Sequence, residues 1–302
     1  MQMYSYYANW QKNDKEKCLF LLLFARYFVP LSNIIANHFN NDLPHTMKKI
    51  LFLFFAVLLP LFATAQDDDF TADRPGTTNS ADILPLGRLQ WETAVGWERS
   101  KLDGPSTTTW TLNSSTLRYG IGGRAEIHLQ ADRLLSSCDG EHDGGFANVA
   151  VGTKVRLYTP ETDGPLLPAV CLLGNVFVPG GSDAAFLPRY WGGQVGLVFQ
   201  HELAPWCTLN YDGELTWSDD ERPQAFLGIC LGFTLSDRLS LMAEEYNYNQ
   251  SGGSESWIGL GLGWQIAPRL QLDLGTDLSL NHFGYYHNLT VGLVWQLTKF
   301  SH

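Results

Sequence analysis

Histidine and serine are the residue types in this sequence that could supply a base and a nucleophile. Serine-based hydrolysis needs the two side chains within hydrogen-bonding reach, with a third group orienting the histidine. The candidates are His128, His142, His201, His282 and His287, with Ser136 and Ser137. No motif joins them, and His142 and His282 stand in polar stretches typical of solvated loops. We therefore expect no catalytic residue in this chain.

Acidic side chains cluster in two polar stretches, where they could bind a divalent cation. One cluster holds Asp139, Glu141 and Asp143, and the other is Asp219-Asp220-Glu221. The five cysteines show neither a CxxC pair nor another metal-ligand spacing. Solvated loop charge explains both clusters, so we expect no metal ion and no cofactor.

A glycine-rich stretch, Gly259-Leu260-Gly261-Leu262-Gly263, superficially resembles a phosphate-binding loop. Such a loop has to open a helix whose N-terminus faces the phosphate. Here the glycines occupy alternate positions, with Leu260, Leu262 and Trp264 between and after them, which is the period of a strand. We interpret the glycines as small residues that leave space on one face of a strand.

The same two-residue period is strongest near the C-terminus. Over residues 270–280 one parity is leucine or threonine, and the other includes Asp273 and Asp277. Residues 289–298 repeat the pattern. A period of two gives a strand with one apolar and one polar face, and about ten tilted residues can cross a membrane. A long hairpin in a soluble sheet explains this stretch equally well, so other parts of the chain have to distinguish the two.

The composition favours a membrane barrel. The 302 residues include 10 Trp and 29 Gly and are only 17% charged, yet the mean hydropathy is -0.10. A helical membrane protein would need several apolar runs of about 20 residues. The net charge is -11; the first 65 residues hold six basic and three acidic side chains, or +3, which leaves -14 for the remainder. This acidic excess argues against a nucleic-acid partner.

Residues 47–65 have the layout of a secretory signal peptide. Two lysines follow Met47, an apolar run extends over residues 50–62, and small residues stand at 63–65. We expect cleavage after residue 65, which leaves Gln66 first. Export of this kind is consistent with insertion into a bacterial outer membrane.

Two further segments flank this signal. We interpret residues 1–46 as an upstream extension that precedes the true start at Met47, and a genuine N-terminal anchoring helix is the alternative. Residues 66–86 are acidic, rich in Pro, Gly and Thr, and without periodicity. We expect this second segment to be irregular and to lie in the periplasm or in the mouth of a barrel.

Twelve alternating stretches follow. We predict strands at residues 87–99, 107–120, 124–134, 146–158, 166–178, 190–201, 206–217, 224–235, 238–249, 255–266, 270–280 and 289–298. In the second of them the apolar parity slips between Leu112 and Leu117, which predicts a β-bulge. Tight turns alternate with longer polar loops, which we predict at 100–106, 135–145, 179–189, 218–223, 250–254 and 281–284.

Loop asymmetry, aromatic residues near strand ends and an even strand number are together typical of outer-membrane proteins. We therefore predict an all-β fold, a transmembrane antiparallel up-and-down β-barrel of about 12 strands over residues 87–300. The last strand has to close on the first. Phe300, near the terminus, is expected to contribute to the signal that directs barrel assembly.

Charged side chains recur on the inward parity of these strands. An Arg or Lys facing lipid at mid-membrane costs about 2–4 kcal/mol, so an inward orientation is favoured. The predicted lumen-lining residues are Arg88, Glu92, Glu98, Arg118, Glu126, Asp132, Lys154, Arg156, Asp212, Glu214, Asp273 and Asp277. A twelve-stranded barrel has an intermediate width, so we expect a narrow or gated pore that residues 66–86 obstruct.

The predicted mature chain opens with Asp73-Arg74-Pro75-Gly76 and continues with Leu84-Pro85-Leu86-Gly87-Arg88-Leu89-Gln90-Trp91-Glu92. Over residues 70–302 the chain resembles a family of outer-membrane transporters named after the MetA pathway of phenol degradation. Members of that family open with a similar Asp-Arg-Pro segment and a Pro-x-Gly-x-hydrophobic-Gln-x-Glu first strand. The resemblance implies an outer-membrane β-barrel that passes small molecules, hydrophobic ones among them.

These observations predict an outer-membrane channel or transporter, not an enzyme, that passes a small solute through an acidic lumen. Its carboxylates should favour cations or neutral solutes over anions. The expected partners are outer-membrane lipid and lipopolysaccharide, the barrel-assembly machinery and the solute. The alternative is a structural or adhesive barrel plugged by Asp73, Arg74, Pro75 and Gly76, and an outer-membrane lipid hydrolase is the weakest hypothesis.

Overall fold

The computed structural model of the protein describes residues 70–101, 105–160, 167–180, 185–218, 223–250, 253–281 and 286–299. Several predicted features lie outside these residues. They are the upstream extension 1–46, the signal 47–65, the first part of the irregular segment (66–69), the acidic cluster at 219–221, His282 and Phe300.

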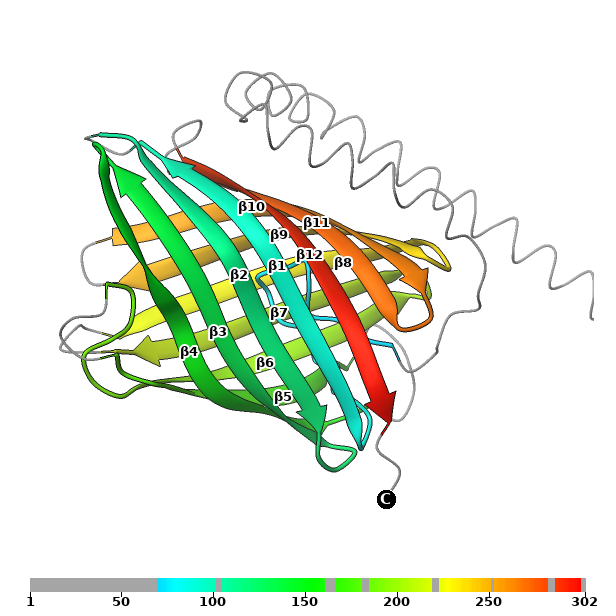
Figure 1. The fold of residues 1–302 in the computed structure, drawn as a ribbon. Helices are drawn as coiled ribbons and strands as arrows, with labels where there is room; N and C mark the ends of the chain where they lie inside the picture. Colours follow the sequence, from blue (N-terminus) through cyan, green and yellow to red (C-terminus); the bar gives the residue numbers. More distant parts are fainter. Residues whose placement is uncertain are drawn as a thin grey trace, which may run out of the picture. The chain divides into compact units, whose positions relative to one another are not determined.

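The alternating stretches fold into twelve strands: β1 (Arg88–Ser100), β2 (Thr107–Gly120), β3 (Ala125–Cys138), β4 (Glu141–Tyr158), β5 (Ala169–Phe177), β6 (Gly192–Ala204), β7 (Cys207–Trp217), β8 (Gln224–Ser236), β9 (Leu239–Gln250), β10 (Gly253–Ala267), β11 (Leu270–Ser279) and β12 (Tyr286–Lys299). Each strand pairs antiparallel with its sequence neighbours, and β12 pairs with β1. The sheet is therefore a closed barrel, as Figure 1 shows. The predicted twelve-stranded up-and-down barrel and its closure between the last and first strands are confirmed.

The outer face of the barrel is apolar and exposed. Leu129 of β3, Val151 of β4 and Val176 of β5 are cross-strand neighbours and are 53%, 48% and 50% exposed. The residues that alternate with them are polar or small, and many are buried. A ring of exposed apolar side chains around a polar interior is what an outer-membrane barrel presents to lipid.

Two predicted loops are largely strand. In the predicted loop 250–254, β9 continues to Gln250 and β10 begins at Gly253. Residues 135–145 are mostly strand, because β3 continues to Cys138 and β4 begins at Glu141. Only Asp139 and Gly140 separate the two strands, and both have positive φ values, 50° and 85°. Asp-Gly is a preferred pair for a two-residue hairpin turn because both positions need a left-handed backbone. The polar composition of this stretch concealed a long hairpin.

The predicted β-bulge is confirmed in β2. Against β1, the pairs Ala94–Ser114 and Gly96–Thr111 leave one residue of β1, Val95, opposite two of β2. Against β3 the register shifts between Thr111 and Asn113. The extra residue therefore lies at Leu112 and Asn113, where the apolar parity begins to slip. Both side chains are exposed, since the bulge puts two consecutive residues on the outer side.

Residues 70–87 contain no strand and lead directly into β1. In Figure 1 this cyan segment passes through the interior of the ring of strands. Its polar groups bond to side chains of strands from β1 to β11. No helix among the described residues is long and apolar enough to cross a membrane.

The ring of exposed apolar side chains on the outer face, here called the apolar belt, predicts that the energetic cost of introducing a charged residue depends on its position. Val151→Arg places a cation among Leu129 and Val176 on the outer face and should reduce the free energy of unfolding by about 2–4 kcal/mol. Urea unfolding in lipid vesicles measures this change. Ile121→Arg is the matched control, because Ile121 is 46% exposed but lies in the turn between β2 and β3; its cost should be about 0–1 kcal/mol. Equal costs at the two positions would contradict the placement of the belt.

Candidate functional site

The interior of the barrel holds two cavities that share one wall. The larger has a volume of about 450 Å³ and the smaller about 180 Å³, and Asp73, Arg74 and Gly76 line both. The larger also contacts Thr216 and Gln224, next to the connection between β7 and β8. The smaller is lined instead by residues beside tight turns at the other barrel end, Thr208, Thr234 and Ser240. The irregular segment thus stands between the two halves of the lumen.

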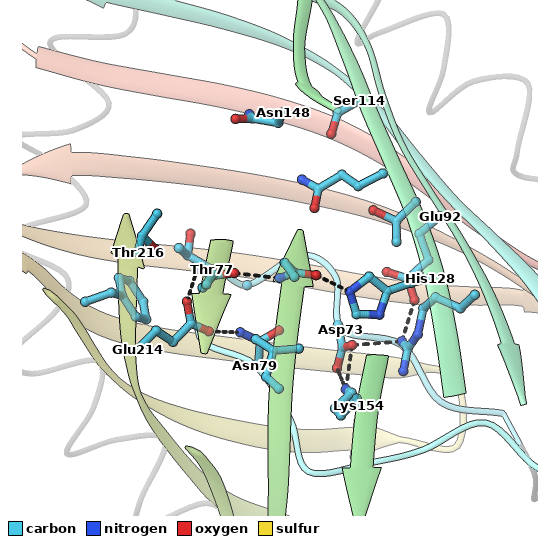
Figure 2. A pocket seen from close by; sticks show the side chains of 18 of the residues that line it. Asp73, Thr77, Asn79, Glu92, Ser114, His128, Asn148, Lys154, Glu214 and Thr216 are labelled. Atoms are coloured by element: carbon cyan, nitrogen blue, oxygen red, sulfur yellow. Dashed lines mark hydrogen bonds and ion pairs between the residues drawn. The ribbon is translucent and has the colours of Figure 1, made fainter. Parts of the chain in front are cut away.

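Asp73 fastens this segment to the wall formed by β2 and β4. Its Oδ2 lies 2.8 Å from Nζ of Lys154 and 3.0 Å from Nη1 of Arg118. Figure 2 shows Asp73 and Lys154 joined in this way. Arg118 also contacts Glu92 of β1 at 2.7 Å and Glu126 of β3 at 2.8 Å. One enclosed cation therefore binds three carboxylates from two strands and the segment.

The charge state of Asp73 follows from these contacts. Burial by itself raises the pKa of Asp73, but the positive charges of Arg118 and Lys154 outweigh burial and hold its pKa below the ordinary value of 3.8. Because the folded-state pKa is lowered, the ionised carboxylate stabilises the fold above about pH 4. This contribution is lost as the pH falls through the folded-state pKa.

Arg74 and Pro75 fasten the segment to the opposite side. Nη2 of Arg74 donates to Oδ1 of Asp273 of β11 at 2.9 Å. Pro75 lies against Gly261 of β10, where an added Cβ would come within 2.4 Å of the proline ring. The space that the glycine-rich stretch leaves on the inner face is therefore filled by the segment at this point.

Backbone amides of the segment bind wall carboxylates. The N–H groups of Thr77 and Thr78 donate to Glu244 of β9 at 2.8–3.1 Å. The N–H and side-chain amide of Asn79 both donate to Asp212 of β7 at 2.9 Å. The same side-chain amide also donates to Glu214 at 2.9 Å, as Figure 2 shows. These acids are matched by uncharged donors from the segment.

Basic, neutral and acidic side chains of the wall all bind the last part of the segment. The carbonyl of Ala81 accepts from Arg156 and from Sγ of Cys171, and its N–H donates to Gln200. The N–H of Leu84 donates to Glu126 at 2.9 Å. Ala81 is fully buried in a small apolar cluster with Cys171, Leu173 and Val198.

The structure places the predicted lumen residues in three situations. Seven contact the segment directly: Arg118, Glu126, Lys154, Arg156, Asp212, Glu214 and Asp273. Glu92 is linked to the segment through Arg118. Arg88 is buried and directly follows the segment in the sequence. Three bond elsewhere: Glu98 accepts from Tyr286, Asp132 accepts from Asn148, and the backbone N–H of Asp277 donates to Asn288.

Besides Cys171, the sequence prediction missed four residues that hold the segment through hydrogen bonds. Glu244 binds Thr77 and Thr78, and Gln90 binds Thr71. Gln200 binds Ala81, and Gln271 binds Arg74. Glu244 is followed by Glu245, so the parity of the acids alone does not say which one faces inward. The structure resolves the ambiguity, because Glu244 shares the buried parity of β9 with Met242 and Tyr246.

A belt of polar side chains lines the larger cavity. His128 Nε2 lies 2.6 Å from Asn175 Oδ1, and Asn175 donates to Gln194 at 2.6 Å. Gln194 in turn donates to Glu214 at 2.5 Å. These four residues come from β3, β5, β6 and β7, so the belt extends around a large part of the wall.

The candidate catalytic pairs are placed as follows. Ser137 and His142 are cross-strand partners in β3 and β4, but no hydrogen bond links their side chains. His201 lies 3.2 Å from the hydroxyl of Tyr211, and Ser136 bonds to Thr109. Within the described ranges no group of three or more His, Cys, Asp or Glu side chains could hold a metal ion. Asp139, Glu141 and Asp143 lie at the hairpin between β3 and β4.

Comparisons with known proteins agree with this architecture. The family model described as "Putative MetA-pathway of phenol degradation" matches residues 72–297. The chain is similar to the COG4313 outer membrane channel from Pseudomonas putida F1, with a TM-score of 0.59 and 11% identity over 75% of this chain and 100% of that one. At this identity the likeness concerns the fold.

Two autotransporter structures are more distant. The translocator domain of NalP from Neisseria meningitidis has a TM-score of 0.46 and 15% identity over 72% of this chain and 91% of that one. The transport unit of AIDA-I from Escherichia coli has a TM-score of 0.47 and 11% identity over 77% and 94%. At TM-scores below 0.5 the similarity supports no further conclusion. No curated protein sequence matches the chain.

The ion pairs of Asp73 predict a large effect from a small change. Asp73→Asn leaves Lys154, which is 1% exposed, without its carboxylate partner, and removing one partner of a buried pair costs about 3–5 kcal/mol. Because the Asp73 side chain is itself 21% exposed, we expect a loss of about 3 kcal/mol and faster hydrogen exchange over residues 73–80.

Two further variants test the cause. Asp82→Asn changes the same residue type within the segment, where Asp82 accepts only from an amide of Gln200, and should lose less than about 1 kcal/mol. The double variant Asp73→Asn/Lys154→Met removes both charges and should recover part of the loss. Equal losses for Asp73→Asn and Asp82→Asn would show that the ion pairs do not anchor the segment.

Proposed function

Because this chain belongs to the family named for the MetA pathway of phenol degradation and folds as an outer-membrane barrel, we propose that it is a channel for a small solute. The observation that supports this proposal is the presence of two cavities in the lumen whose common wall is Asp73, Arg74 and Gly76. A short movement of one segment would join them into a passage. No strand would have to separate.

The lumen favours cations and neutral solutes over anions. Asp212, Glu214 and Glu244 accept hydrogen bonds from amide groups of the segment and its neighbours, so their negative charge is bound but not cancelled by these contacts. Arg118 and Lys154 are each engaged with carboxylates. An ion in this passage therefore meets a negative wall, and fixed carboxylates of this kind select cations.

The irregular segment acts as the gate in this proposal. Most of its contacts are separate hydrogen bonds and ion pairs, whereas the strands are held by continuous ladders. The chain is exported by the predicted signal at 47–65 and resides in the bacterial outer membrane, where lipid and lipopolysaccharide surround the apolar belt.

A plugged structural or adhesive barrel is the second candidate. The observation that favours it is the density of ion pairs around Arg118, which ties the segment to β1, β2 and β3. If this network does not open, the lumen stays closed and only the outer loops contact partners. Conductance measurements distinguish the two candidates.

Ion selectivity provides the first test. In planar bilayers the protein should give a small conductance with a cation preference. Glu214→Gln should lower the cation-to-anion permeability ratio by roughly two- to fivefold, because a unit charge about 4 Å from an ion in water is worth about 1 kcal/mol. Glu245→Gln is the matched control, since Glu245 is exposed next to the buried Glu244, and should leave the ratio unchanged. An anion preference would contradict the proposal.

The gate provides the second test. Arg74→Ala removes the ion pair with Asp273 and the side chain that separates the cavities, so the single-channel conductance should rise. Arg124→Ala, an exposed residue next to β3 in the turn after β2, should not change it. A barrel that is silent with or without Arg74 supports the structural candidate. An unchanged, measurable current would mean that ions bypass the segment.

A further inference from the structure

The larger cavity has the features of a built binding site. Its volume of about 450 Å³ lies within the range of roughly 300–1,000 Å³ that small-molecule sites occupy. Most of its lining side chains are polar, and its charged groups already have partners. Asp73, Glu92 and Glu126 contact Arg118, and Lys154 contacts Asp73. Arg74 contacts Asp273, and Glu214 accepts from the amides of Asn79 and Gln194. A ligand would therefore meet mainly neutral polar groups.

The polar belt supplies these neutral groups. An amide side chain offers two N–H donors and a carbonyl with two lone pairs. Asn175 and Gln194 each use one donor and one lone pair within the belt. Each therefore has one N–H and one lone pair that the belt does not use, and both side chains line the cavity.

The backbone of β4 is shaped to let this belt form. An added Cβ at Gly152 would lie 1.9 Å from Oδ1 of Asn175 and 2.2 Å from Nε2 of His128. Any side chain at this position would displace the hydrogen bond between β3 and β5. The contact between His128 and Asn175 thus passes over a strand that has no side chain there.

Aromatic rings face the same cavity. Phe177, Phe226 and Tyr248 all line it, and the rings of Phe226 and Tyr248 lie 5.1 Å apart. Rings bind flat apolar faces, while amides bind hydroxyl groups. A solute with several hydroxyls around an apolar ring face satisfies both parts of the lining.

We propose that this cavity binds a neutral, polyhydroxylated solute of about the size of a monosaccharide. The proposal rests on the proposed function in that the cavity lies on the path across the barrel. Sites that hydrogen-bond hydroxyl groups discriminate strongly against analogues that lack them, because the polar groups of the site are then left unpaired. A purely apolar solute would leave the free donors and acceptors of Asn175 and Gln194 without partners.

Charged ligands fit this cavity less well. An anion would have to compete with three carboxylates for Arg118. A cation would find Glu214, which accepts from Asn79 and Gln194, but would make no use of the amide belt. The cation is therefore the competing outcome of the test.

Equilibrium binding to the purified, full-length protein in detergent tests this site without requiring transport. Ligand-observed NMR titrations would compare D-glucose with phenol, an apolar ring with one hydroxyl, and with choline, a cation. D-Glucose should bind most tightly. Asn175→Leu and Gln194→Leu should each weaken glucose binding roughly tenfold, the effect of losing one or two hydrogen bonds. Asn210→Leu, in the smaller cavity, is the matched control and should leave the affinity unchanged.

Tighter binding of phenol or choline, or equal loss from Asn210→Leu and Asn175→Leu, overturns the proposal. The comparison of three ligands on the unmodified protein decides the matter even if a variant does not fold. Glucose binding without any channel current would overturn the proposed passage and keep the site. Channel current without glucose binding would overturn the site and keep the passage.

Discussion

The enclosed guanidinium of Arg118 constrains the rest of this lumen. Its side chain is 2% exposed and contacts Asp73, Glu92 and Glu126. A buried cation with fewer partners would be strongly destabilising, so the three carboxylates favour the closed position of the segment. Two of them belong to neighbouring strands and the third to the irregular segment. The position of the segment and the charges of the wall therefore fix each other.

The segment uses two kinds of contact, and they differ in what they demand of its sequence. Asp73 and Arg74 act through their side chains, as partners of Lys154 and Asp273. Thr77 and Thr78 act through backbone N–H groups that bind Glu244. Every residue except proline has such a group. This contact therefore depends on the carboxylate of Glu244 and not on the side chains at positions 77 and 78. This difference explains why the Asp-Arg pair is a recognisable signal in the sequence.

The period of two made the strands, their number and the inward parity of most charged residues predictable. It failed where the local pattern was ambiguous, as at the adjacent Glu244 and Glu245. It also failed where composition suggested a loop, although Asp139-Gly140 is itself the signal of a tight hairpin. The path of residues 70–86 could not be predicted, because their partners lie far along the chain. Arg74 and Asp273, for example, are 199 positions apart, and no local pattern reports such a contact.

Closure of β12 on β1 also limits the order in which the molecule can assemble. The seam joins the first strand to the last, so it cannot form until the whole chain has been delivered, and contacts of such long range form slowly. The segment precedes β1 in the chain, yet its partners are distributed from β1 to β11. The segment therefore has its full set of partners only once the sheet has closed around it. In this sense the contents of the lumen are completed at the same step that completes its wall.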